Sequence, residues 1–594
     1  MRSSSWRAWL LALVAFASSA AWGQAEGRRA CTLGYSNSFF TPSKWPDRPL
    51  EELAQGQLGV VDPSFDHFYL FFAYRRIAGK PLTASDVERL RRFDPCWDDG
   101  SKGFHGKDFA SSSVMKAARD EWARARAALV PPAAAPTPGA LSVMGYYESA
   151  VPNCNPDAFR TAASTLRARQ ASHGGDAWVS AWVEGQDRVM QFCFDASGEL
   201  PADVPADAPQ WLRADRRYQV AAAHFYAGHY EEAARLFSDI GADTASPWRP
   251  LGRYLAARAR MRQASAAGND VERARAWRQA RELLEVAGSD AGDAAVRADS
   301  ARMLQRVRLK AEPGHVFVEI DARLSARALS ADVGQDVRDF DAKRGGSARF
   351  DVADPGFAAW LHALRGAGPS ADADIASASR AALVAWLVSA KRDEPRLTQL
   401  LERAARVPRS APEYQTVQLH RIRLQPDVRQ ALRVVRDLLA LPPRELNVQD
   451  RNRVKAAAAP LAASADDLAS FVYRDPIAHP EVDELSKNPN VIVPALDDAG
   501  GAIMNRALPL DRLYAIYSSR ATPAPLRREL LGVVWSRALV LGRWDLLHML
   551  QADMRAALPA GSALLQKVES ASPSERRARA ALFLLRHPGI VGSV

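Results

Sequence analysis

Several acidic side chains stand close together in the sequence at a spacing that could serve metal chemistry. Asp94, Asp98 and Asp99 surround Cys96 in the segment FDPCWDDG. Clustered carboxylates can bind Ca²⁺, but the EF-hand spacing and its final Glu are missing here. We interpret the segment as a solvated turn rich in Asp and Gly.

Two histidines form the other possible metal pair. His224 and His229 are five residues apart across Gly228, whereas a metal pair on one helix needs a spacing of three or four residues. The pattern favours ordinary helix and turn residues, and His67, in an aromatic-rich stretch, is interpreted as a core or interface histidine. The sequence has no G-x-S-x-G, P-loop or G-x-G-x-x-G motif. We therefore predict no catalytic, cofactor-binding or metal-binding residue and no cofactor.

One pair of residues resembles an enzyme motif. Glu148 followed by Ser149 is similar to the Glu–Ser pair of lytic transglycosylases, in which the Glu is the catalytic acid. The glycine-rich segment of that family is missing downstream, where Ala150 to Asn153 follow instead. A catalytic acid also needs a cleft that raises its pKa. A peptidoglycan hydrolase or transglycosylase-related protein with a helical superhelix is therefore the alternative function, not the first.

Aromatic residues are concentrated between positions 178 and 248. Aromatic side chains are enriched at interfaces, but these stand mostly at helical spacing, which favours core packing. Gln186 and Asp187 are polar within an apolar segment, so they either face a groove or hydrogen-bond a neighbouring loop. The aromatic residues concerned are Trp178, Trp182, Tyr218, Phe225, Tyr226, Tyr230, Phe237 and Trp248.

The four cysteines are Cys31, Cys96, Cys154 and Cys193. An even number in an exported chain predicts two disulfides. Cys154 precedes one predicted helix and Cys193 ends the next, so a helical hairpin would bring these two together and leave Cys31 to pair with Cys96. A zinc site is the weaker interpretation, because no C-x-x-C spacing or histidine accompanies the thiols.

The N-terminus has the pattern of an export signal. Arg2 and Arg7 precede an uncharged apolar run, and small residues then offer cleavage before Gln24 or Glu26. We expect residues 1–23 to be a cleaved signal peptide and the protein to be periplasmic or secreted; an uncleaved anchor is the alternative. No later segment has the roughly 20 apolar residues of a membrane span.

Composition narrows the class of partner. The 594 residues are 47% hydrophobic and 25% charged, with a formal net charge of +10. Basic charge can indicate nucleic acid, but here Lys and Arg are interleaved with Asp and Glu, as in RARAWRQARELLE at 273–285. We expect solvated helix faces and no nucleic-acid partner. The Ala- and Arg-rich usage and the lack of an Asn-x-Ser/Thr sequon favour a bacterial periplasm.

The chain divides by composition into successive regions. An irregular to helical N-terminal region, 24–130, contains an apolar helix at Ser64 to Ile77 and a capping box at Ser85 to Glu88. A Pro/Ala linker, 131–140, precedes a helical hairpin region, 141–213, that holds Cys154 and Cys193. From there the chain is helix after helix, and only 315–321 and 490–496 resemble strands.

The segment from Ala214 has the spacing of a helical repeat. Gly228 and Tyr230 are followed by Ala233 and Phe237, so the last three share one helix face. This spacing resembles the second half of a tetratricopeptide repeat. In that family Gly and Tyr open the second helix, a small residue lets the two helices approach, and an aromatic fills the space beneath.

A second window strengthens this resemblance. Trp248, Leu251 and Gly252 match the W-x-x-L-G opening of the tetratricopeptide repeat. We assign such repeats to 214–310 and degenerate helical repeats to 311–594. The resemblance implies an all-α fold, an α-solenoid of helical hairpins behind an irregular, disulfide-bearing N-terminal region.

The function that follows is binding. Stacked helical hairpins leave an extended surface that repeat proteins use for partners. The whole chain also resembles uncharacterised exported helical-repeat proteins of the bacterial cell envelope, which implies no activity. We expect a non-enzymatic interaction scaffold of the cell envelope, with a protein or peptide partner.

Overall fold

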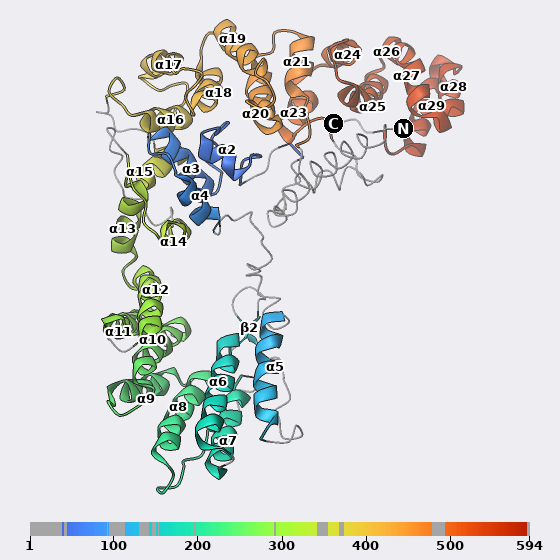
Figure 1. The fold of residues 1–594 in the computed structure, drawn as a ribbon. Coiled ribbons are helices and arrows are strands. Elements are labelled where there is room, and N and C mark those ends of the chain that lie inside the picture. Colours follow the sequence, from blue (N-terminus) through green and yellow to red (C-terminus); the bar gives the residue numbers. More distant parts are fainter. Residues whose placement is uncertain are drawn as a thin grey trace, which may run out of the picture. The chain divides into compact units, whose positions relative to one another are not determined.

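Helices make up nearly all of the regular structure (Figure 1). The computed structural model describes residues 39–40, 44–91, 93, 113–129, 142–144, 150–152, 154–174, 176–193, 198–289, 293–340, 355–367, 374–477 and 494–590. Within these ranges the strands are β1 (Ser142–Met144) and β2 (Ala150–Pro152), an antiparallel pair with Val143 opposite Val151. The predicted all-α fold is confirmed.

The chain forms two compact units. Unit 1 consists of residues 1–97 and 320–594, and unit 2 consists of residues 98–319. The N-terminal region predicted at 24–130 is divided between them, because 44–91 belong to unit 1 and 113–129 to unit 2. Unit 1 is therefore built from two stretches that lie far apart in the sequence.

In unit 2 each helix packs against the next one along the chain, from α5 to α12. Contacts of this kind are local in sequence, as in proteins built from consecutive helical pairs. The helices are α5 (Ser113–Ala127), α6 (Pro156–His173), α7 (Ala177–Gln191), α8 (Gln210–Tyr226), α9 (Tyr230–Ala242), α10 (Arg249–Ala266), α11 (Asp270–Ser289) and α12 (Ala294–Ala311), followed by α13 (Pro313–Ser325), which crosses the unit boundary.

In unit 1 two of the three N-terminal helices pack with later ones: α3 contacts α14, α15 and α16, and α4 contacts α14, while α2 packs on α3 and α4. The N-terminal helices are α2 (Leu50–Gln55), α3 (His67–Ile77) and α4 (Ala84–Arg91). The later elements are α14 (Val333–Asp339), α15 (Phe357–His362), η2 (Ala363–Ala367), α16 (Arg380–Ser389), α17 (Leu397–Ala405), α18 (Tyr414–Leu424), α19 (Val428–Leu439), α20 (Val448–Ala458), η3 (Ala459–Leu461), α21 (Ala465–Val472), α23 (Asp498–Ala502), η4 (Ile503–Ala507), α24 (Leu510–Ser518), α25 (Ala524–Leu541), α26 (Trp544–Met549), α27 (Gln551–Ala557), η5 (Pro559–Gly561), α28 (Ser562–Glu569) and α29 (Pro573–Arg586).

Many helices begin where a polar side chain satisfies the first free backbone amides. The Asn155 side chain accepts from the amide of Ala158 at the start of α6, and Asp427 accepts from the amides of Arg429 and Gln430 in α19. The capping box predicted at 85–88 is wrong by two residues. The reciprocal pair is Thr83 with Asp86, since each side chain accepts a hydrogen bond from the other residue's amide.

Helix α3 is the centre of the unit 1 core. It is apolar on all sides, and nine of its residues are buried, which is typical of a helix surrounded by protein. Phe71 and Tyr74 lie against Phe357 with ring centroids 5.3 and 5.5 Å apart. Arg75, also buried, donates to the carbonyls of Leu324 and Arg327 at the end of α13. The predicted apolar helix at 64–77 is thus a core element.

One of the two predicted strand-like runs is helical. Residues 315–321 lie within α13, where Val316, Ile320 and Leu324 are buried and Val318 is 68% exposed. A strand would place positions 316 and 318 on the same face, whereas burial at every fourth residue has the helical period. In the other run, 490–493 lie outside the described residues, and Leu496 forms an isolated antiparallel bridge with Tyr473.

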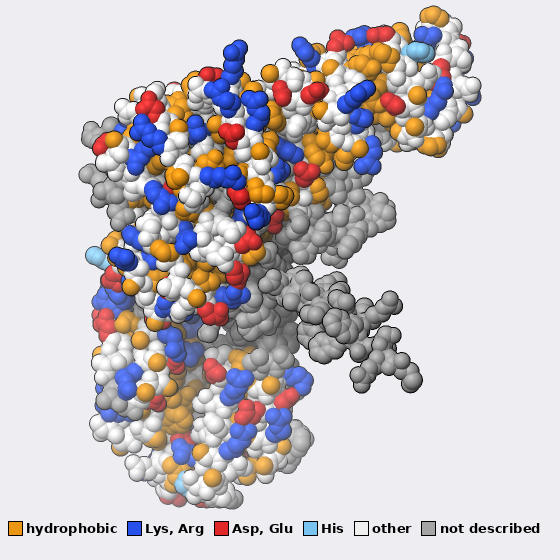
Figure 2. Space-filling model, turned by 45° about the horizontal axis from the view of Figure 1, so that its top comes forward, with side chains coloured by type: hydrophobic (Ala, Val, Ile, Leu, Met, Phe, Trp, Pro, Cys, Tyr) orange, Lys and Arg blue, Asp and Glu red, His pale blue; other side chains and the backbone are white. Residues whose placement is uncertain are grey.

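Basic and acidic side chains are intermingled over the face shown in Figure 2. This agrees with the interleaved charges of the sequence and with solvated helix faces. None of the helices in the described part of the chain has both the length and the apolarity needed to cross a bilayer.

Candidate functional site

A disulfide joins the two ends of the α6–α7 pair. Cys154 stands just before α6 and Cys193 just after α7, and their Cα atoms are 5.2 Å apart. This is the pairing expected from a helical hairpin, and it is confirmed. The predicted partners Cys31 and Cys96 lie outside the described residues.

The α8–α9 turn is made by Gly228. Its φ is +83°, a left-handed conformation that glycine adopts without strain. The amide of His229 bonds to the carbonyl of His224, and that of Gly228 to the carbonyl of Phe225, which satisfies the last carbonyls of α8. Tyr230, the first residue of α9, is half-buried with its ring 6.0 Å from that of Phe225.

One face of α9 is packed into the unit 2 core. Ala233 and Phe237 are buried, at 0% and 2% exposure. The ring of Phe237 meets Tyr218 of α8 edge-on at 5.9 Å. Sequence spacing therefore brings these side chains together on one helix face.

Trp248 joins three helices through one carboxylate. It occupies the N-cap position of α10 without a side-chain capping hydrogen bond, and its ring stacks on Tyr218 with centroids 4.3 Å apart. Its indole Nε1 donates to Asp215 Oδ1 at 2.8 Å, and Arg169 of α6 donates to both oxygens of Asp215 at 2.7 and 2.8 Å. Asp215 is 1% exposed. Sequence reasoning did not single out Asp215. A buried Asp almost always has a partner, so an Asp next to Ala214 in a helix with an apolar face could have been predicted to form a buried ion pair.

The close backbone approach between α9 and α10 is at Gly252. A Cβ added there would stand 2.5 Å from the Gly241 nitrogen and 2.7 Å from the Phe237 carbonyl oxygen. Gly252 is buried, and Leu251 beside it is half-buried. The glycine of the W-x-x-L-G pattern thus lies where no larger residue fits. We call this α9–α10 contact the glycine seam.

A groove opens beside these helices, within unit 2. It has a volume of about 850 Å³ and is lined by the start of α9, the end of α10 and the start of α11. Its polar lining includes His229, Glu232, Arg260, Gln263, Glu272, Arg275 and Gln279. We call it the repeat groove. Sequence reasoning predicted Tyr230, in its lining, as a packing residue of the repeat, and it did not single out the charged residues of α10 and α11.

Part of the charge in the repeat groove is available to a partner, although Glu232 is bound by Arg235 and Arg260 donates to Gln263. Glu231 is 74% exposed, and its nearest cation, Arg260, is 3.9 Å away. Burial lowers the pKa of Arg260, partly offset by Glu231. Glu272 and Arg275 are exposed on α11. Loosely paired charges of both signs suit a polar peptide better than an apolar ligand.

A second hollow, in unit 1, has its charges already occupied. It measures about 640 Å³ and includes Arg380, Arg403 and Glu413. Arg380 forms a two-point ion pair with Glu413, which is 2% exposed. Arg403 donates to the carbonyls of Ile375 and Ala378. Both arginines are already bound to groups of the protein itself, so this hollow is the weaker candidate for a binding site.

The remaining candidate site residues either form contacts that stabilise the fold or lie outside the residues that the structure describes. Asp187 accepts from Arg126 at 2.9 Å through both oxygens, and burial raises the pKa of Asp187 despite that arginine. Gln186 is buried beside Gln219, and His67 Nε2 lies 2.9 Å from the Val337 carbonyl. Glu148 and the Asp94–Asp99 turn lie outside the described residues.

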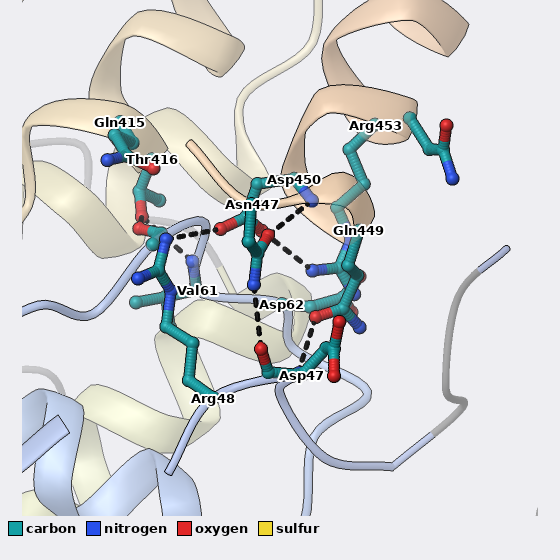
Figure 3. Close-up of polar contacts among 12 residues, drawn as sticks. Asp47, Arg48, Val61, Asp62, Gln415, Thr416, Asn447, Gln449, Asp450 and Arg453 are labelled. Carbon is teal, nitrogen blue, oxygen red and sulfur yellow. Dashed lines mark hydrogen bonds and ion pairs between the residues drawn. The ribbon is translucent and has the colours of Figure 1, made fainter. Parts of the chain in front are cut away.

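A buried polar cluster fastens the N-terminal segment of unit 1 to helices α18 and α20 (Figure 3). Arg48 donates to Asp450 Oδ2 at 3.4 Å and to the Glu445 carbonyl at 2.6 Å. The side chains of Arg48 and Asp450 are each 3% exposed. Arg453 pairs with Asp450 at 3.3 Å and with Asp62 at 3.1 Å. We call this cluster the polar junction.

Amides and a hydroxyl complete the polar junction. The Asn447 side chain caps α20 and donates to the Asp47 carbonyl at 2.8 Å, while Gln449 accepts from the Asp47 amide at 2.8 Å. Thr416 accepts from the Val61 amide at 2.9 Å. The amide and carbonyl of Asp47 and the amide of Val61 each have a partner here, whereas Arg48 Nε and Gln415 Oε1 are buried without one.

Charge and burial oppose one another within the polar junction. Burial raises the pKa of Asp450 in spite of Arg453 and Arg48. Burial would also raise the pKa of Asp62, but Arg453 and Ser64 together lower it below its usual value. No sequence signal pairs these residues, because they are nearly 400 positions apart.

Among the described residues no group of three or more His, Cys, Asp or Glu is placed to hold a metal ion. Comparison of the chain with family models, with curated proteins and with solved structures finds no match.

Proposed function

We propose that the chain is a non-enzymatic interaction scaffold of the bacterial cell envelope, an α-solenoid that binds a protein or peptide partner in the repeat groove. The observation that carries this proposal is a groove of about 850 Å³ with exposed, loosely paired charges beside helices that pack tetratricopeptide-like residues. Grooves between helices of repeat proteins are common sites for extended peptides.

The packing around the groove favours binding over catalysis. The glycine seam and the Trp248–Asp215–Arg169 contacts make a rigid support on which the groove side chains stand. A rigid surface lowers the entropy that association costs. The charges of both signs predict a polar partner segment with its own acidic and basic residues.

The Cys154–Cys193 disulfide supports an extracytoplasmic location. Disulfides persist in the periplasm and outside the cell and are rare in the cytoplasm. Cell fractionation with N-terminal sequencing tests the location. We expect a mature chain beginning near Gln24 or Glu26, and an intact Met1 in a cytoplasmic pool alone would contradict it.

Site-specific crosslinking in living bacteria tests the binding surface. A photoreactive amino acid at Gln279, in the groove, should give a discrete adduct with one partner protein. The matched control is the exposed Arg278, the neighbouring residue of α11 outside the groove lining. Charge reversal at Arg275 should reduce the adduct at position 279. Equal amounts of adduct from positions 278 and 279, or no adduct from position 279, would contradict the assignment of partner binding to the repeat groove.

A further inference from the structure

The turn between α8 and α9 brings two imidazoles together, with their planes tilted by 51°. His224 Nδ1 and His229 Nδ1 are 3.3 Å apart, with ring centroids 5.5 Å apart. His224 is near the end of α8 and His229 lies on the turn, where Gly228 reverses the chain. The spacing of five residues is too long for one turn of helix, but the left-handed glycine closes it.

The Nδ1–Nδ1 distance matches the distance between two nitrogen ligands of a tetrahedral zinc ion. With Zn–N bonds of about 2.0–2.1 Å, two nitrogens of a tetrahedral site lie about 3.3–3.4 Å apart. The two Nδ1 atoms form a hydrogen bond in this structure, so one of them carries a proton, and zinc binding requires that proton to move to Nε2 or to leave. His229 is exposed and His224 is partly exposed, so both rings have room to rotate toward one ion.

The surroundings favour the neutral imidazole, which is the form that binds metal. Burial and the neighbouring His229 lower the pKa of His224, and Arg235 acts in the same direction. Glu232 opposes this shift, but its carboxylate is held by Arg235, which donates to it through Nε at 3.0 Å. Burial therefore favours the neutral form of the His224 ring.

Two ligands leave two positions of a tetrahedral ion open. His229 is part of the lining of the repeat groove, so the open positions are accessible to molecules within it. Zinc sites with open positions take water or a side chain from a bound molecule.

From these observations we propose that His224 and His229 form a two-histidine zinc site at the mouth of the repeat groove, with water or a partner side chain completing the coordination. The proposal does not rest on the interaction-scaffold function, because the two rings belong to the free chain.

Calorimetric titration of the full chain, without an affinity tag, with zinc chloride at neutral pH tests the site. We expect the wild type to bind one zinc ion more than His224→Gln/His229→Gln, and each single variant to lose that ion. The matched control is His315→Gln, which removes an exposed histidine from α13 and should bind zinc as the wild type does.

A second measurement separates binding from folding. Zinc should raise the melting temperature of the wild type and of His315→Gln but not that of the double variant, since a ligand stabilises only the state it binds. Without zinc all three should melt alike. Acidification should weaken zinc binding, because protons compete for the same nitrogens. Equal zinc binding by wild type and double variant, or none by the wild type, would overturn the proposal, whatever the crosslinking at position 279 shows.

Discussion

The glycine seam of unit 2 and the polar junction of unit 1 hold helices together by different means. At the seam, α9 and α10 approach so closely that a Cβ on Gly252 would meet backbone atoms. At the junction, polar groups of residues 402 positions apart are buried together. The seam depends on the lack of side-chain volume, and the junction depends on ion pairs and hydrogen bonds between buried polar groups.

This difference predicts different weaknesses. A packed seam of small residues should tolerate changes of pH and salt but not added atoms. A buried ionic cluster should tolerate little loss of partners and should respond to protonation. Hydrogen exchange followed by mass spectrometry reads both regions in one chain, since peptides from α9–α10 and from α18–α20 are separate.

The largest effect should come from breaking the polar junction. Asp450→Ala leaves Arg48 and Arg453 without their shared carboxylate, and removing one partner of a buried pair typically costs about 3–5 kcal/mol. Denaturant melts should show the loss, with faster exchange in α18–α20. The control is Asp437→Ala, which removes an exposed acid from α19. Equal melts of the two variants would show that the junction adds no stability.

The next effect should come from the disulfide of unit 2. Cys193→Ser removes the bridge between the ends of the α6–α7 pair, and loss of a native disulfide typically costs about 2–5 kcal/mol. The faster exchange should be confined to unit 2 and should leave α18–α20 protected. The double variant Cys154→Ser/Cys193→Ser should melt like the single one. A wild-type melt that is unchanged by reducing agent would contradict the expectation.

A smaller effect is expected at the glycine seam. Gly252→Ala adds a methyl group against the backbone of Gly241 and Phe237, and overpacking typically costs about 1–3 kcal/mol. Gly268→Ala is the matched control, because nothing lies within 4 Å of the added atom and its φ is not left-handed. Thermal melts should separate the two. If Gly252→Ala melts like Gly268→Ala, the seam is looser than its geometry indicates.

The smallest effect at neutral pH concerns His420 of α18, next to the polar junction. Its Nδ1 accepts from Arg423 Nε at 3.2 Å. Burial, with the Arg423 charge, lowers the pKa of His420 to about 3. The unfolded imidazole has a pKa of about 6.5, so the unfolded chain binds the proton first as pH falls. His420 therefore contributes stability above about pH 6.5 that is lost between pH 6.5 and 3.

His420→Gln tests that slope. Its stability should differ from wild type by only about 1 kcal/mol at neutral pH, since one hydrogen bond changes. Its stability should fall less steeply than that of wild type as pH drops below 6.5. Parallel curves in the two proteins would show that His420 does not carry this proton linkage.

Sequence reasoning succeeded where partners are close along the chain. The succession of helical segments and the resemblance to tetratricopeptide repeats predicted the all-α fold, and the positions of Cys154 and Cys193 at helix ends predicted their disulfide. Spacing likewise placed Ala233 and Phe237 on one buried face. These features depend on helical period and turn chemistry, which a single sequence contains.

Sequence reasoning failed for features that depend on contacts between residues far apart in the chain. The run at 315–321 has β-branched residues but is helical, because tertiary burial selected the period of four. The polar junction could not be predicted, since Arg48 and Asp450 look like ordinary surface residues of their own segments. The His224–His229 contact was missed because a fixed helical spacing was applied across a left-handed glycine.

The polar junction also has a consequence for biosynthesis. The Val61 amide bonds to Thr416, 355 residues later in the chain. At synthesis rates of about 5–20 residues per second, that partner is made roughly 20–70 s after Val61. The aromatic helix α3 emerges early, and Phe357, which covers it, follows late. During that interval the apolar surface of α3 lacks the later residues that cover it in the folded core.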